Sequence, residues 1–246
     1  MECPKCAHPR RVEQLTCDSC GLVFHKYESY LRRREQPVAA DEPDTDSLQS
    51  RLAAGRRALM TPPQGMAGLL PLYALTWLLF VVWGWSYMVQ DITSLGLDPG
   101  FLHNINLPFH EAGHVVFGLF GQFIGSLGGT LGQLLIPVVA GIALLWHRGD
   151  TFGAGLCLWW FGQNFLDIAP YMADARAGQL PLLGGNYGRS SPYGFHDWEF
   201  ILGETGLLTH DQTLAAVTLN LGRGIMLLAM IWGARLLWLA WSNPRR

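Results

Sequence analysis

Two long apolar runs that carry almost no charge limit what this chain can fold into. No charged residue lies from Ala58 to Gln90. Between Asp98 and Arg148 the only charged residue is Glu111. A helix of about 20 apolar residues crosses a bilayer, and lipid offers no partner for an unpaired backbone group. The sequence therefore predicts an all-α membrane protein, a polytopic bundle of about four to six membrane helices.

The apolar runs predict helices over about 69–89, 105–125, 131–146, 152–171 and 214–241. Pro108 suits the first turn of the second helix, where Asn106 could cap it. The Gly-rich stretch 126–130 predicts a break before the third helix, and Pro170 predicts an interruption near the end of the fourth.

Polar residues gather near the N-terminus, although the net charge is only −2. Ten of the 17 Lys and Arg residues lie in the first 57 residues. Arginines precede the first apolar run and Asp91 and Asp98 follow it, which predicts a cytoplasmic N-terminus. We expect an integral protein of the inner or plasma membrane, in a bacterium. The basic residues form no broad patch interleaved with aromatic residues, so we expect no nucleic-acid partner.

Four cysteines near the N-terminus form two Cys-x-x-Cys pairs, namely Cys3 with Cys6 and Cys17 with Cys20. This spacing predicts a structural Zn²⁺ site and resembles small zinc-ribbon modules. The alternative is two disulfides, but the first residues show no signal-peptide pattern, and disulfides are rare in the cytoplasm. We expect a zinc ribbon and short helix over 1–36, a linker with a potential surface helix over 37–65, and a membrane domain over 66–246. The ribbon could bind a protein partner.

The motif His110-Glu111-Ala112-Gly113-His114 lies inside the second apolar run. On a helix the two histidines are one turn apart on the same face, so both can reach one Zn²⁺. Glu111 is placed to take a proton from a water that the metal activates. The alternative is a purely structural cluster. Ionisable groups are costly in a bilayer-length apolar segment, so the functional interpretation is favoured.

In this setting the motif resembles the site-2 protease class of intramembrane zinc metalloproteases, over residues of about 105–175. The resemblance implies a third metal ligand, an aspartate on a later membrane helix. Asn164, Pro170 and Asp174 follow in the order that this class uses, so Asp174 is the first candidate and Asp167 the second. The alternative for Asp174 is a simple ion pair at the membrane edge. Asn164 could hold the substrate backbone or the oxyanion.

The segment His196-Asp197-Trp198-Glu199 follows a loop rich in Gly and Pro. His196 could be a metal ligand, and Asp197 could accept a hydrogen bond that orients a histidine. In the alternative, Asp197 caps a short helix and His196 is an interfacial residue.

The resemblance implies a zinc-dependent endopeptidase that cleaves a membrane-embedded segment of a protein substrate, with His110, His114 and Asp174 as ligands. A different hypothesis is a membrane scaffold or sensor with a structural metal and a partner-binding ribbon. A metal-dependent hydrolase of another membrane substrate is a third. A third protein ligand beside an open coordination position would favour an enzyme, whereas four protein ligands would favour the scaffold.

Overall fold

The computed structural model describes residues 1–9, 11, 14–35, 55, 57–98, 100–183 and 185–243. The chain divides into two compact units, Met1–Gly55 and Arg56–Arg246. The described residues form helices and three isolated β-bridges, and no strand is found among them. This confirms the all-helical fold class. Most of the linker predicted over 37–65 lies outside the described residues.

The N-terminal unit holds the four paired cysteines and the helix α1 (Phe24–Glu35). Each Cys-x-x-Cys pair forms a tight turn, in which the carbonyl of Cys3 or Cys17 accepts a backbone hydrogen bond from four residues on. The bridges Glu2↔Pro9 and Thr16↔Val23 close the two turns. Cys3, Cys17 and Phe24 are its buried core, which is too small to stabilise a fold without further help.

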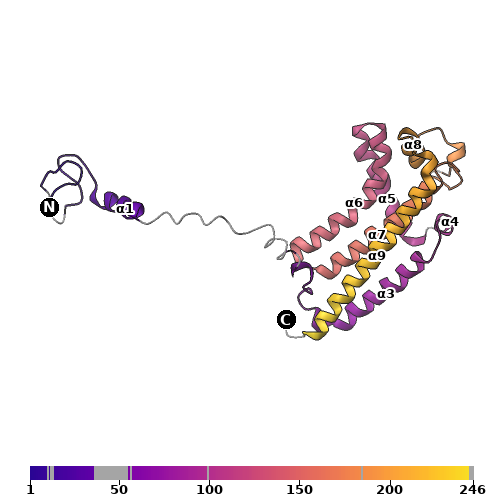
Figure 1. Cartoon of the computed structure of the whole chain (residues 1–246), viewed down its shortest axis with the longest axis horizontal. Coiled ribbons are helices and arrows are strands. Elements are labelled where there is room, and N and C mark those ends of the chain that lie inside the picture. Colours follow the sequence, from indigo (N-terminus) through magenta and orange to yellow (C-terminus); the bar gives the residue numbers. More distant parts are fainter. Residues whose placement is uncertain are drawn as a thin grey trace. The chain divides into compact units, whose positions relative to one another are not determined.

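The second unit consists mainly of long helices, and a longer segment separates α7 from α8 (Figure 1). Its elements are η1 (Met66–Leu69), α3 (Leu70–Met88), α4 (Ile92–Leu97), α5 (Gly100–Phe117), η2 (Gly118–Phe120), α6 (Gln122–Arg148), α7 (Thr151–Ala173), η3 (Gly188–Ser190), α8 (Asp197–Glu204), η4 (Leu208–His210) and α9 (Asp211–Ser242). Helix α7 is buried along most of its length and packs against α3, α6 and α9. Trp159 on α7 and Met226 on α9 lie in the shared core.

Three helical segments are long and apolar enough to cross a membrane: Met66–Met88, Gln122–Arg148 and Leu208–Ser242. Their outward surfaces are apolar; on α3, for example, Leu72, Leu79 and Val82 are exposed. Helices α5 and α7 are not among these three, so the predicted count of four to six membrane helices is not confirmed.

The predicted breaks differ from the structure. Helix α5 begins at Gly100, so Pro108 lies inside it rather than in its first turn. The chain turns at Gly118–Gly121, where Gly121 has a φ of +99°, and the stretch 126–130 is helical within α6. Pro170 lies inside α7, which continues to Ala173. Packed neighbours hold these segments helical, because tertiary context overrides the weak local preference of Gly and Pro.

Glycines bring α5 and α6 into backbone contact. A Cβ atom on Gly128 would lie 2.7 Å from the Gly113 carbonyl oxygen, and one on Gly132 would lie 2.9 Å from the Gly113 Cα. No other residue permits such an approach. This close approach of the two backbones places the histidine motif of α5 next to α6.

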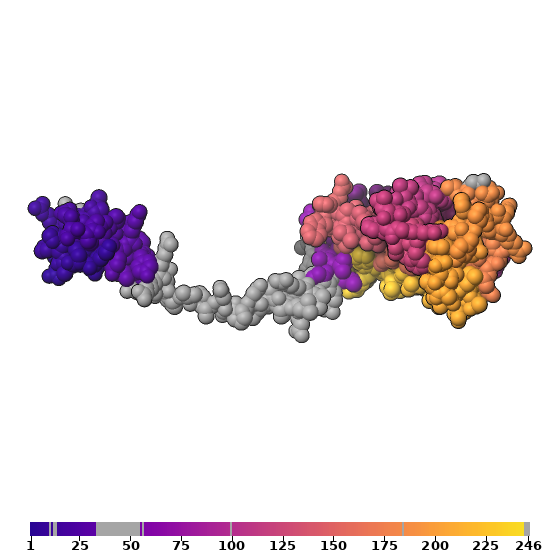
Figure 2. Space-filling model, turned by 90° about the horizontal axis from the view of Figure 1, so that it is seen from above, coloured from indigo at the N-terminus to yellow at the C-terminus, as the bar shows by residue number. Residues whose placement is uncertain are grey.

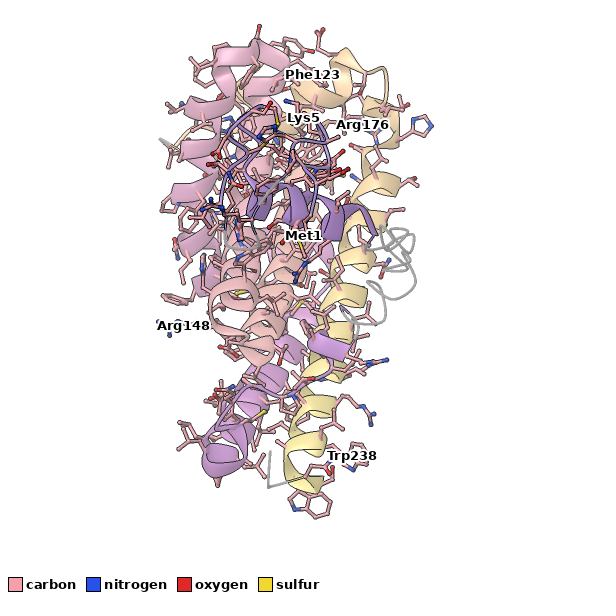
Figure 3. All side chains as sticks on the ribbon, turned by 90° about the vertical axis from the view of Figure 1, so that its left-hand side faces the viewer. Met1, Lys5, Phe123, Arg148, Arg176 and Trp238 are labelled. Atoms are coloured by element: carbon pink, nitrogen blue, oxygen red, sulfur yellow. The ribbon has the colours of Figure 1, made fainter. Side chains whose placement is uncertain are left out.

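The histidine motif lies toward one end of the bundle. Figure 3 labels Phe123, at the start of α6, and Arg176, just after α7, near that end, and Trp238 at the opposite end. Helix α8 packs on α6 there, and in Figure 2 the orange segment that contains α8 adjoins the pink segment of α6. After α7, residues such as Leu180 and Tyr187 line one cavity together with residues of α5 and α7.

Candidate metal centre

Helix α5 places His110 and His114 side by side, as their spacing predicts. Their ring centroids are 4.7 Å apart and their planes are nearly perpendicular, at 79°. Both imidazoles are half-buried. Glu111 lies on the same helix beside them.

A carboxylate from the other side of the site, Asp197, completes the group. Asp197 Oδ2 lies 3.1 Å from His110 Nε2 and 3.2 Å from His114 Nε2. It is the first residue of α8, whose contact with α6 carries it to the histidines. The ligand atoms of these three residues all lie within 4.8 Å of one another, so they could hold one metal ion.

Hydrogen bonds from α6 fix the orientation of all three side chains. The Nδ1 of His110 donates to Gln133 Oε1 at 2.8 Å, and the Nδ1 of His114 donates to the Gly125 carbonyl at 2.7 Å. Ser126 Oγ donates to Asp197 Oδ1 at 2.9 Å. Because the acceptors hold each Nδ1–H, both Nε2 atoms are left for a metal.

The spacing of the ligand atoms fits a tetrahedral ion. Ligands bound at about 2.0–2.1 Å in a tetrahedron lie about 3.3 Å apart, close to the distances from Asp197 to the two imidazoles. Gly129 on α6 leaves the necessary space, because a Cβ atom there would collide with His110 Nε2 and lie 2.6 Å from His114 Nε2. Two imidazoles and one carboxylate are a donor set that Zn²⁺ accepts.

The two histidines keep the Asp197 carboxyl ionised. Burial raises the pKa of its carboxyl, but hydrogen bonds and charge interactions with His110 and His114 outweigh burial and lower this pKa to about 2. The carboxylate is therefore ionised at neutral pH, as metal binding requires.

The three residues and Glu111 line a cavity of about 1020 Å³. Apolar side chains, such as Leu107 and Ile168, form much of its wall. Glu111 makes no hydrogen bond or ion pair with any residue that the structure describes, so its carboxylate is available to a ligand. No fourth His, Cys, Asp or Glu joins the group within the described parts of the chain.

The structure does not bring Asp174 or His196 into this group. Asp174 is the residue at the C-terminal end of α7. Its carboxylate accepts hydrogen bonds from the backbone N–H groups of Gln179 (2.9 Å) and Leu180 (2.8 Å), which order the following loop. His196 is 1% exposed, caps α8 by accepting from the Glu199 N–H, and has its Nε2 3.5 Å from Asp174 Oδ2. Both side chains therefore shape the loop that leads to Asp197.

Asn164 and Asp167 also lie outside the group. Asn164 is 0% exposed, donates to the Trp160 carbonyl at 3.0 Å and does not line the cavity. Asp167 does line the cavity, but it pairs with His103 on α5. Asn164 therefore belongs to the packed interior of α7, and Asp167 belongs to the wall of the cavity. Neither residue belongs to the candidate metal centre.

Sequence reasoning missed Asp197 as a candidate metal ligand and the contributions of α6. Ser126, Gly129 and Gln133 are spaced by three and four residues, so they share one face of a helix. Polar residues on one face of an apolar helix were the signal available for Ser126 and Gln133. For Asp197, the signal was its place next to His196 in a polar cluster after the loop.

The cysteine cluster belongs to the N-terminal unit. All five cysteines of the chain are free, so the alternative of two disulfides is not what the structure has. Cys3 and Cys20 have their sulfurs 3.6 Å apart, as do Cys6 and Cys17. Tetrahedral thiolates at about 2.3 Å from Zn²⁺ would lie about 3.8 Å apart. The four thiols could therefore hold one metal ion.

Comparison of the chain with protein-family models, with curated proteins and with solved structures finds no match.

Proposed function

We propose that the membrane unit is a zinc-dependent hydrolase that cleaves a peptide bond of a membrane-embedded protein segment. The observation that carries the proposal is the convergence of His110, His114 and Asp197 at the wall of a cavity that also contains Glu111. Three protein ligands are typical of catalytic zinc, whereas structural zinc has four. This favours an enzyme over the scaffold.

The three ligands would hold Zn²⁺, which supplies Lewis-acid activation of water and of a carbonyl group. Glu111 accepts the proton of the attacking water and passes it to the amine that leaves. The hydrogen bonds to Gln133 and Gly125 keep both imidazoles in the metal-binding tautomer. The roles of these residues need no contribution from Asn164 or Asp174.

Membrane-spanning helices and an apolar cavity support a substrate that is itself apolar. The span Gln122–Arg148 carries Gln133 and Ser126, so part of the metal centre is built on a helix that is long and apolar enough to cross a membrane. The proposed substrate is a protein segment that enters this cavity from the bilayer. The HEAGH motif supports the same class of reaction through its likeness to the site-2 proteases.

The test is Glu111→Gln in the full chain, reconstituted in liposomes with a mixture of single-pass transmembrane peptides. We expect unchanged zinc content and loss of cleavage, measured as new peptide termini by mass spectrometry. The matched control is Glu204→Gln, an exposed glutamate outside the cavity, which should cleave like the unmodified protein. Cleavage by the Glu111→Gln variant would refute the proposal, and so would zinc binding without any cleavage by the unmodified protein.

For the N-terminal unit we propose one structural Zn²⁺ bound by Cys3, Cys6, Cys17 and Cys20. Burial raises the pKa of the Cys3 thiol, but hydrogen bonds from the backbone N–H groups of Lys5 and Cys6 lower it, whereas burial and contacts with the other thiols raise the pKa of Cys20. Such N–H groups stabilise thiolates and are a feature of sites that hold a metal. A unit with so small a core would owe its fold to the metal, and it could then present a surface to a partner.

A further inference from the structure

A second polar pair, His103 on α5 and Asp167 on α7, lines the same cavity. His103 Nδ1 lies 2.8 Å from Asp167 Oδ1. Because a carboxylate only accepts, Nδ1 carries the proton of this hydrogen bond. The Asp167 side chain is 4% exposed and that of His103 is 19% exposed, so the imidazole is the more accessible member of the pair.

Neighbouring side chains hold this imidazole in one orientation. Asn106 Nδ2 donates to Asp167 Oδ2 at 3.0 Å, and the indole N–H of Trp160 donates to Asn106 Oδ1 at 2.9 Å. The His103 ring stacks on Tyr171, with centroids 5.9 Å apart and planes at 11°. The imidazole of His103 is thus held by a hydrogen bond at its edge and by stacking on its face, so it is oriented for a hydrogen bond to a ligand.

The other ring nitrogen of His103 is free for a ligand. Its Nε2 has no hydrogen-bond partner among the residues that the structure describes. An imidazole beside a carboxylate can carry protons on both nitrogens, which makes Nε2 a donor to an oxygen atom. A purely structural pair between α5 and α7 would not need its imidazole to line a cavity.

The distance from the metal centre defines what this nitrogen could bind. His103 precedes His110 by seven residues, which is two helical turns or about 10.5 Å. Leu107 lies between them in the sequence of α5, and Leu107 and Ile168 both contribute apolar side chains to the cavity wall. An extended peptide advances about 3.3 Å per residue, so about three residues would span this distance.

We propose that His103 is a substrate-binding residue. Its Nε2 donates a hydrogen bond to a substrate oxygen about three residues from the bond that is hydrolysed. The oxygen belongs either to a backbone carbonyl of a longer chain or to a terminal carboxylate. The inference rests on the proposed hydrolase function, because it takes the metal centre as the other fixed point.

Three synthetic probes test the inference on the zinc-loaded full chain in detergent. Each probe has a hydroxamate, which binds zinc, followed by two leucines and one of three ends: a carboxylate, a dimethylamide, which has a carbonyl oxygen but no N–H, or an ethyl group. We expect one of the oxygen-bearing probes to bind about tenfold more tightly than the ethyl probe, as a single good hydrogen bond allows. The preferred end identifies the source of the oxygen. Equal affinities for all three probes would overturn the inference.

The variant His103→Phe keeps a ring on Tyr171 and removes the donor. It should abolish the preference between probes while the ethyl probe still binds, whereas a merely structural role would weaken all three probes equally and overturn the proposal. His147→Phe, on an exposed residue outside the cavity, is the matched control. Asp167→Asn gives a second test should His103→Phe fail to fold, and it should also reduce the preference. If no probe binds the unmodified protein, the hydrolase function itself fails.

Discussion

Gly129→Ala should remove metal binding at the membrane centre while it leaves the fold intact. A Cβ atom at position 129 would occupy the space in which the Nε2 atoms of His110 and His114 converge. Both contacts are with the far ends of side chains, so the metal-free protein can turn the rings aside. The metal-bound protein cannot, because the ligands must point to one place.

The expected change in folding stability is smaller than the expected loss of zinc affinity. Alanine in a helix interior is favoured over glycine by about 1 kcal/mol, and moving two rings off their preferred rotamers costs about 0.5–1.5 kcal/mol each. The free energy of unfolding without metal should therefore change by no more than about 2 kcal/mol. Loss of an outer hydrogen bond to a ligand costs roughly 10–100-fold in metal affinity. Displacing the ligands themselves should lower zinc affinity by more than about 100-fold, which corresponds to a loss of more than about 2.7 kcal/mol in binding free energy.

The assay is zinc titration of the full chain against a competing fluorescent chelator, with thermal unfolding in excess chelator as the stability measurement. The unmodified protein should bind zinc at both the ribbon and the membrane centre. The Gly129→Ala variant should bind zinc at the ribbon alone. Gly224→Ala on α9 is the control, because a Cβ atom there meets nothing within 4 Å. Full zinc binding by Gly129→Ala would show that the imidazoles do not converge against α6, and the reasoning would fail.

Three further predictions concern the metal ligands. Asp197→Asn should lower zinc affinity at the membrane centre by more than about 100-fold, whereas Asp174→Asn should leave that affinity nearly unchanged and lower thermal stability instead, as zinc titration and thermal unfolding would show. Gln133→Ala should weaken zinc roughly tenfold, because the imidazole of His110 loses its orienting acceptor, and the same titration measures this. The double variant Cys17→Ser and Cys20→Ser should remove one zinc per chain by elemental analysis; undiminished zinc would contradict the ribbon site.

The parts of the fold that follow from local sequence were predictable, and the parts that depend on distant contacts were not. The first apolar run gave a helix over nearly the predicted residues, since length and lack of charge are local properties. The breaks at the Gly-rich stretch and at Pro170 were wrong, because neighbouring helices stabilise those segments. The closing of the site by Asp197 depends on a contact with His110 across 87 residues, which no local pattern reveals.

Glycines of α6 account both for the misplaced break and for the space at the candidate metal centre. On α6, Gly128 and Gly132 allow the backbone of α5 to approach, and Gly129 on the neighbouring face leaves space for the two imidazoles. Replacing any of these glycines would disturb either the approach of the helices or the ligand position. The glycines therefore serve contact rather than flexibility, which is why the stretch stays helical. Because zinc would bind only when α5, α6 and α8 are packed together, its binding free energy would add to the stability of that packing.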